Sequence, residues 1–234
     1  MNHFIVVEPD EFAENPREAF DCVGTLYTWH SKYTLGGQTD ENHQEPIKNL
    51  NVWIFDHFED VAWMPELKDY VSHNNELYFE DMEIDEEQTA HFNQIVEEWK
   101  QNNLCVIPVY MYDHSEITIS DKPFSCPWDS GQIGFIYMTK DTFETQMQRP
   151  YSVKEAEKIL VAELKELDTY LTGDVYSYSI YSTEETCDMT KIYESTYHVK
   201  EFECITSCVG FYGYQYCKES ALAELNAIQQ KVDV

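Results

Sequence analysis

Strand-like runs follow one another along this chain without the regular helices that would carry it between parallel strands. Residues 104–112 and 132–139 are two such runs, separated by polar and turn-forming residues. Others, rich in β-branched and aromatic residues, cover residues 4–7, 22–30, 174–182 and 195–208. Pro108 predicts a sheet edge or a bulge within its run. We therefore expect an α+β fold, with antiparallel sheets and a few packed helices.

Three stretches have the spacing of amphipathic helices, at residues 85–103, 152–171 and 217–232. Ser152 and Glu155 match a capping box, and Gly173 is placed to end the second helix in the left-handed conformation. The short apolar run at residues 51–64 suits either a strand or a buried helix.

The length of 234 residues suits one large domain or two small ones. Turn residues at 148–152 mark a boundary. We expect an α+β region at 1–150, holding a strand–loop–strand unit and an acidic segment. A helix–strand–strand–helix region at 151–234 is expected to pack on it as one compact unit.

Charge restricts the partners of this protein. There are 44 acidic and 15 basic residues, giving a net charge of −29. Such a chain repels nucleic acid and anionic membranes and attracts basic protein surfaces. Solubility alone and a high-salt habitat are alternative reasons for the excess. The sequence shows no signal peptide or membrane span, and its seven cysteines are scattered, so we expect a cytoplasmic protein with reduced thiols.

The segment from Glu76 to Glu98 contains nine acids and no Lys or Arg. Carboxylates on an extended chain lie about 7 Å apart on one face and can imitate a row of phosphates. A solvated face is the alternative. The predicted partner-binding residues are Glu76, Glu80, Asp81, Glu83, Asp85, Glu86 and Glu87.

The stretch from Tyr110 to Met138 contains the ionisable and nucleophilic side chains that could form a catalytic site. A catalytic site would use Asp113, His114, Cys126 and Asp129, with Cys126 as nucleophile and His114 or His30 as its base. The favoured interpretation is a rigid structural connection between two strands. Its polar side chains, including Ser125, would then bond to nearby main chain. Trp128 would be buried and would hold the loop down.

No metal or cofactor is expected. Cys204 and Cys208 are too far apart on a strand to share a zinc ion, and with Cys187, His198 and Cys217 nearby they are better explained as buried thiols. No glycine-rich phosphate loop or known catalytic motif occurs.

The central stretch "VYMYDHSEITISDKPFSCPWDSGQIGFIYMTKD" resembles the signature of a protein family encoded by bacteriophages and other mobile elements. The same family pattern appears in "GTLYTWHSKYTLG", "ELDTYLTGDVYSYSIY" and "SCVGFYG". The resemblance covers most of the chain. It carries no catalytic role over to Asp113, His114 or Cys126.

Three functions remain open from the sequence. The first is an inhibitor of a bacterial antiviral defence system, acting in the host cytoplasm. It would bind the basic, nucleic-acid-binding surface of a defence protein without contacting nucleic acid or membrane itself. The second is a small-molecule or nucleotide-binding protein, or a hydrolase, built around residues 113–129. The third is an accessory protein that is acidic only for solubility. The sequence leaves the oligomeric state open.

Overall fold

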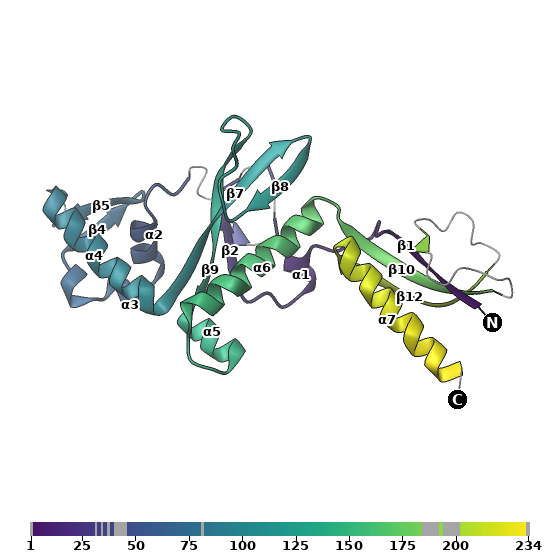
Figure 1. The fold of residues 1–234 in the computed structure, drawn as a ribbon. Helices are drawn as coiled ribbons and strands as arrows, with labels where there is room; N and C mark the ends of the chain where they lie inside the picture. Colours follow the sequence, from purple (N-terminus) through teal and green to yellow (C-terminus); the bar gives the residue numbers. More distant parts are fainter. Residues whose placement is uncertain are drawn as a thin grey trace. The chain divides into compact units, whose positions relative to one another are not determined.

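The computed structural model describes residues 2–30, 32–33, 35–36, 38–39, 46–80, 82–183, 192–193 and 202–232 (Figure 1). Within these residues helices stand beside largely antiparallel sheets, which confirms the predicted α+β class. Two compact units divide the chain. Unit 1 comprises Met1–Phe20, His114–Thr118 and Lys165–Val234, and unit 2 comprises Asp21–Asp113 and Ile119–Leu164.

Unit 1 is built on a sheet with the strand order β11-β1-β10-β12. Its strands are β1 (Asn2–Pro9), β10 (Val175–Thr183), β11 (Ile192–Tyr193) and β12 (Glu203–Tyr212). The helices of this unit are α1 (Pro16–Ala19) and α7 (Tyr214–Val232). Ile5 lies opposite Ile180 in the antiparallel pair of β1 and β10. Both pack with Ala221 and Leu225 of α7, so the unit has a core of its own.

Unit 2 contains the main part of a second sheet, with the order β3-β2-β9-β7-β8. The strands are β2 (Thr25–Thr28), β3 (Gln38–Thr39), β7 (Leu104–His114), β8 (Glu116–Ser120) and β9 (Ser130–Thr139). After β9 come α5 (Lys140–Met147) and α6 (Val153–Leu171). Leu160 of α6 and Ile136 of β9 both lie against Gly24, where an added Cβ would be 2.4 Å from the Leu160 side chain. A glycine is therefore needed where the chain enters β2.

A small third sheet, β4-β5-β6, also belongs to unit 2. It consists of β4 (Tyr70–His73), β5 (Glu76–Phe79) and β6 (Met82–Glu83). Around it are α2 (Leu50–His57), α3 (Glu59–Ala62), the 3-10 helix η1 (Pro65–Leu67) and α4 (Glu86–Asn103). Trp53 of α2 packs edge-on against Phe135 of β9, with ring centroids 4.5 Å apart. Phe55 of α2 contacts Phe92 of α4 in the same core cluster.

Several predicted elements are confirmed. The predicted helices at 85–103, 152–171 and 217–232 correspond to α4, α6 and α7, and the ambiguous run at 51–64 forms α2 and α3. Gly173 has φ +72°, and the N–H groups of Gly173 and Asp174 donate to the carbonyls of Tyr170 and Thr169. These bonds form a Schellman motif, which ends α6. The pairing of β7 with β9 shifts register between Val109 and Tyr110, but the extra residue is Ile133 of β9, so the bulge expected within the run of Pro108 lies on the partner strand.

Other features differ from expectation. The strand β8 lies inside the stretch expected to be a loop between two strands. The strand expected at 195–208 is observed from Glu203, and residues 194–201 lie outside the described residues. The expected boundary at 148–152 falls inside unit 2, because β1 pairs along its whole length with β10 and so joins the first residues to the C-terminal elements.

Candidate functional site

The predicted partner-binding acids occupy one continuous segment of unit 2, from β5 through β6 into the first turn of α4. Those that the structure describes all have exposed side chains, and we call them the acidic face: Glu76, Glu80, Glu83, Asp85, Glu86 and Glu87. Asp81 lies outside the described residues. Left-handed residues turn the chain within this segment: Asn74 and Asn75 form the tip of the β4–β5 hairpin, and Glu80 has φ 47°.

Asp85 has a structural role besides its charge. Its carboxylate accepts a hydrogen bond from the Gln88 backbone N–H at 2.8 Å, and the Gln88 side chain accepts one from the Asp85 N–H at 3.0 Å. This capping box begins α4. Glu86 and Glu87 follow in the first turn, where the helix dipole stabilises negative charge. The acids at this end of the face are therefore held in place by the helix that they help to start.

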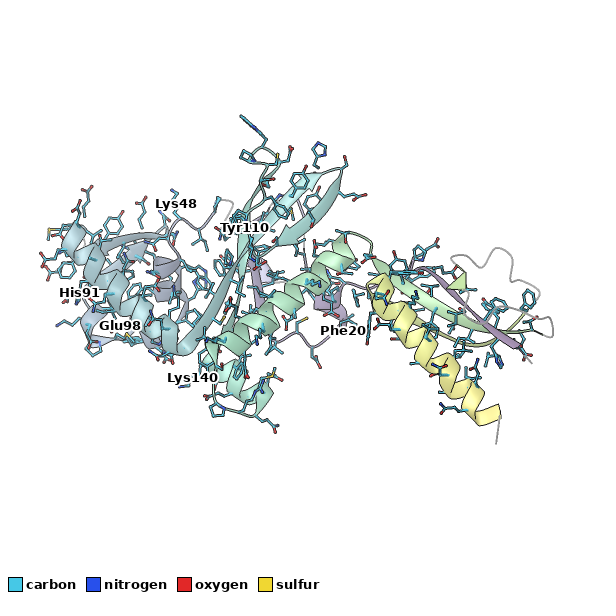
Figure 2. The ribbon with its side chains drawn as sticks, in the orientation of Figure 1. Phe20, Lys48, His91, Glu98, Tyr110 and Lys140 are labelled. Atoms are coloured by element: carbon cyan, nitrogen blue, oxygen red, sulfur yellow. The ribbon has the colours of Figure 1, made fainter. Side chains whose placement is uncertain are left out.

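Tyr70 ties the third sheet to α4. Its hydroxyl donates to the Gln88 carbonyl at 2.9 Å and lies 3.0 Å from Nδ1 of His91. Because one hydroxyl proton cannot serve both partners, the His91 ring nitrogen is the donor in the second bond. The Tyr70 side chain is buried, and desolvation together with the Asp85 charge raises its pKa. Figure 2 shows His91 and Glu98 extending from α4.

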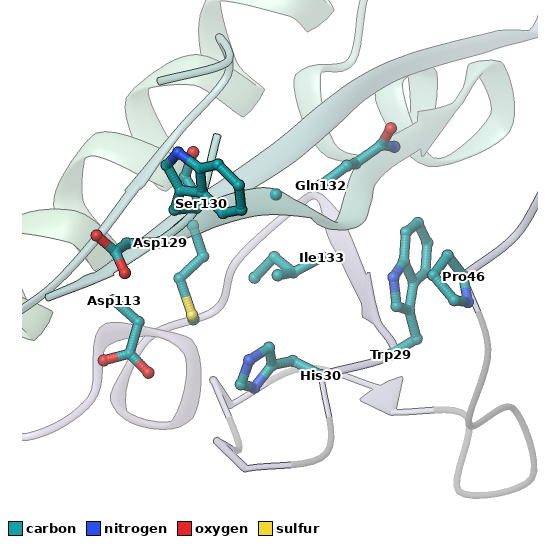
Figure 3. A pocket seen from close by; sticks show the side chains of 11 residues that line it. Trp29, His30, Pro46, Asp113, Asp129, Ser130, Gln132 and Ile133 are labelled. Carbon is teal, nitrogen blue, oxygen red and sulfur yellow. The ribbon is translucent and has the colours of Figure 1, made fainter. Parts of the chain in front are cut away.

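A pocket of about 480 Å³ opens in unit 2 beside the signature stretch. Residues from four parts of the chain line it: Trp29, His30, Pro46, Met111, Asp113, Trp128, Asp129, Ser130, Gly131, Gln132 and Ile133. The pairing of β2, β9 and β7 brings three of these parts together. The Trp29 N–H donates to the Ile133 carbonyl and the Asp113 N–H to the Asp129 carbonyl, each at 2.9 Å. Figure 3 shows Asp113 and Asp129 on one side of the pocket and Trp29 with Pro46 on the other.

Alternation along β7 sets which of its side chains face this region. Val106, Pro108 and Tyr110 line a neighbouring pocket of about 350 Å³ that shares Trp29 and Gln132 with the first. Alternation along a regular strand would place Met111 and Asp113 on the opposite face from Tyr110. The register shift leaves this alternation intact, because β7 advances one residue from Val109 to Tyr110 while β9 passes from Gly134 to Gln132, and the extra residue is Ile133 of β9. Met111 and Asp113 consequently line the larger pocket.

Asp113 forms an ion pair at the wall of the pocket. Its carboxylate lies 3.0 Å from the Lys32 ammonium and accepts a hydrogen bond from the Tyr33 hydroxyl at 3.1 Å. The bond from Lys32 holds the Asp113 pKa below its usual value, with a smaller contribution from Tyr33. The Tyr33 ring stacks on His30, with centroids 5.2 Å apart. His30 is held further by a bond from the Lys32 N–H to its Nδ1.

Cys126 and Asp129 form a turn ahead of β9. The Cys126 thiol lies 3.6 Å from Oδ2 of Asp129, and the Ser130 hydroxyl donates to the Cys126 carbonyl. A nucleophilic cysteine needs a cationic or basic neighbour to stabilise its thiolate, whereas a carboxylate opposes that charge. This contact therefore favours a structural role for Cys126 over nucleophilic catalysis.

The predicted burial of Trp128 is wrong: its side chain is 91% exposed. The loop is held by its own hydrogen bonds, so it does not need the indole as an anchor. His114 and Ser125 are exposed and are not among the residues that line the pocket. Of the suggested catalytic set, Asp113 and Asp129 line the pocket, with His30 rather than His114 as its histidine. Some polar side chains of the stretch therefore stabilise the loop, and others line the pocket.

Sequence reasoning missed Trp29, Lys32, Tyr33 and Gln132 as parts of this site. Trp29, Lys32 and Tyr33 all lie in the segment "GTLYTWHSKYTLG", and Gln132 lies in the signature stretch itself. The cysteines also differ from expectation, because Cys204 and Cys208 on β12 are exposed, while Cys105 and Cys217 are buried. Cys187 and His198 lie outside the described residues. Among the residues that are described, no group of three or more His, Cys, Asp or Glu could hold a metal ion.

Comparison with protein-family models gives no match to this chain, and comparisons with curated protein sequences and with solved structures give none. Over the described part of the chain, no helix combines the length and the apolar character needed to cross a bilayer.

Proposed function

We propose that this protein binds a basic protein surface through the acidic face. The supporting observation is that every residue of the face is exposed, on a segment anchored by the capping box of Asp85 and Gln88 and by Tyr70. A backbone held in this way needs little ordering when a partner binds, which lowers the entropic cost of association. No Lys or Arg occurs between Glu76 and Glu98 to neutralise them.

The partner that fits this face is a nucleic-acid-binding protein. Its basic surface is built to hold a row of phosphates, and exposed carboxylates compete for the same Lys and Arg side chains. The net charge of −29 adds long-range attraction to such a surface. Together with the resemblance to proteins of mobile elements, this leads us to propose inhibition of a bacterial antiviral defence protein in the host cytoplasm.

The test is capture of proteins from a bacterial lysate by three immobilised versions of this chain. The first is the native chain. The second, the face variant, has Glu76, Glu80, Glu83, Glu86 and Glu87 changed to Gln and keeps Asp85 because that residue caps α4. The third, the control variant, has Gln at the exposed positions Glu11, Glu14, Glu18, Glu219 and Glu224 of unit 1. Both variants lose the same number of charges.

We expect the native chain and the control variant to retain one or more nucleic-acid-binding proteins that added DNA displaces. The face variant should retain at least tenfold less, and binding should weaken as salt screens the charges. Equal loss in both variants would show that total charge, rather than this face, governs binding. That result would favour acidity for solubility.

A further inference from the structure

The larger pocket of unit 2 combines aromatic walls with carboxylates, and the proposed function does not use it. Trp29 and Trp128 both line it, and Trp128 exposes 91% of its side chain. An indole contributes a large apolar and π surface, which a flat ligand can cover. The pocket volume of about 480 Å³ falls within the range of small-molecule sites. Trp128 thus offers a surface for a ligand without being needed to hold the loop.

The charge of the pocket selects among flat ligands. Asp113 and Asp129 contribute carboxylates to the lining, and the pKa of Asp113 is held low, so it remains ionised at neutral pH. The nearby Lys32 ammonium is already paired with Asp113. A phosphate or carboxylate ligand would therefore meet negative charge here. A cation would be attracted by both carboxylates and by the aromatic faces.

Asp129 is the carboxylate best placed to meet a cation. Asp113 already accepts hydrogen bonds from Lys32 and Tyr33, whereas the Asp129 carboxylate contacts the Cys126 thiol, which is a weak donor. A thiol–carboxylate bond is readily exchanged for a charge-assisted bond from an amidine or ammonium. Trp128 is the adjacent residue, so one ligand can contact its ring and the Asp129 carboxylate together.

We propose that this pocket binds an organic cation with a flat body, of the amidine, guanidinium or aromatic amine class. The cation bonds to Asp129, while its flat part covers Trp128 and Trp29. Two sources share this chemistry: a free small molecule and the arginine side chain of a protein. The inference does not depend on the acidic face, whose residues do not line the pocket.

Benzamidine is a suitable probe, and benzamide is its neutral counterpart of the same shape. Binding is followed by the NMR signals of the indole N–H groups. Comparison with the spectrum of Trp128→Ala identifies the Trp128 signal. We expect benzamidine to shift this signal saturably, with a Kd on the order of 1 mM for so small a fragment. Benzamide should bind at least tenfold more weakly, because it carries no charge.

Single substitutions then test which side chains contact benzamidine. Asp129→Asn and Trp128→Ala should each weaken benzamidine binding at least fivefold. Trp63→Ala and Asp60→Asn change an exposed Trp and an exposed Asp elsewhere in unit 2, and they should leave it unchanged. Thermal unfolding checks that each variant is folded. The face variant should also bind benzamidine normally, so this proposal and the proposed function can fail separately.

A third ligand, acetyl-arginine amide, has capped ends and keeps only the positive charge of its guanidinium, and it distinguishes the two sources. Tighter binding than benzamidine would support an arginine side chain, and weaker binding would support a free aromatic cation. Equal binding of benzamide and benzamidine would overturn the proposal. So would the absence of a saturable shift, or unchanged affinity in both Asp129→Asn and Trp128→Ala.

Discussion

The carboxylate of Glu163 in α6 accepts hydrogen bonds from the backbone N–H groups of both Val23 and Gly24, at 2.7 Å and 3.1 Å. Those two residues lead directly into β2, whose last residue precedes Trp29 of the pocket. One side chain of a helix therefore satisfies two backbone donors at the start of a central strand. The position of β2 depends on this contact as well as on its pairing with β9.

Replacing Glu163 with Ala should destabilise unit 2, because the two backbone donors lose their acceptor. We expect a loss of about 1–3 kcal/mol in the free energy of unfolding, measured by denaturant titration. Glu157→Ala changes an exposed acid of the same helix and should cost less than about 0.5 kcal/mol. Equal effects of the two substitutions would contradict a specific role for Glu163.

Gly134 of β9 lies at a close approach of two strands. A Cβ at this position would lie 2.0 Å from the Tyr27 carbonyl oxygen, a backbone atom that cannot move aside alone. Gly134→Ala should therefore destabilise the protein by more than about 2 kcal/mol, as measured by thermal unfolding. Gly131→Ala is the matched control in the same strand, since its Cβ would meet nothing within 4 Å.

Asp85 should affect stability, whereas its neighbours in the acidic face should not. Asp85→Ala removes the cap of α4 and should cost about 1 kcal/mol, and Asp85→Ser should restore most of that loss because Ser also caps helices. Glu83→Ala, at an exposed strand position, should change little. Circular dichroism during urea unfolding measures these differences. An unchanged midpoint for Asp85→Ala would contradict the capping role.

The ion pair of Asp113 predicts an acid-dependent change near the pocket. Its pKa is depressed in the folded protein, chiefly by the hydrogen bond from Lys32. The pair therefore contributes stability above the unfolded pKa of about 3.9 and loses it as the pH falls through the folded value. An NMR titration of the Asp113 carboxyl carbon should show this low pKa. Lys32→Met should raise it, and an unchanged value would exclude the ion pair.

Alkylation should separate the cysteines into two groups. Burial raises the pKa of Cys105 and of Cys217 to about 11, so neither forms much thiolate at pH 8. Cys204 and Cys208 are exposed on β12. Iodoacetamide should modify the exposed pair first, as read by peptide mass spectrometry, and the buried pair only after denaturation. Rapid native labelling of Cys105 would contradict its burial.

The sequence predicts best those elements whose signals are local. The start of α4 follows from Asp85 and the glutamates after it, and the end of α6 follows from Gly173. The run at 51–64 stayed ambiguous because Val52, Trp53, Ile54 and Phe55 are all buried, so α2 shows no polar face in its centre. The strand β8 was missed because its hydroxyl residues also suit a turn.

The pocket could not be predicted because it depends on pairing between distant segments. Trp29, Met111 and Ile133 meet only through the order β2-β9-β7 and the register of those strands. Trp128 was predicted to be buried from its size alone, but the covering of a side chain depends on what packs above it, which the local sequence does not specify. Asp113 and Asp129 were identified from their residue types, and the structure adds Lys32 and Tyr33.

The bulge of β9 makes the pocket depend on the pairing of two strands as well as on residue identity, because Ile133 is an extra residue opposite the step from Val109 to Tyr110. A slip of β9 by one residue would close the bulge without changing the sequence. Gln132 would then turn to the other face of the sheet, since side chains alternate along a regular strand. An alignment of related chains would count the loss of Ile133 as a minor gap, although it would remove both the bulge and a residue that lines the pocket.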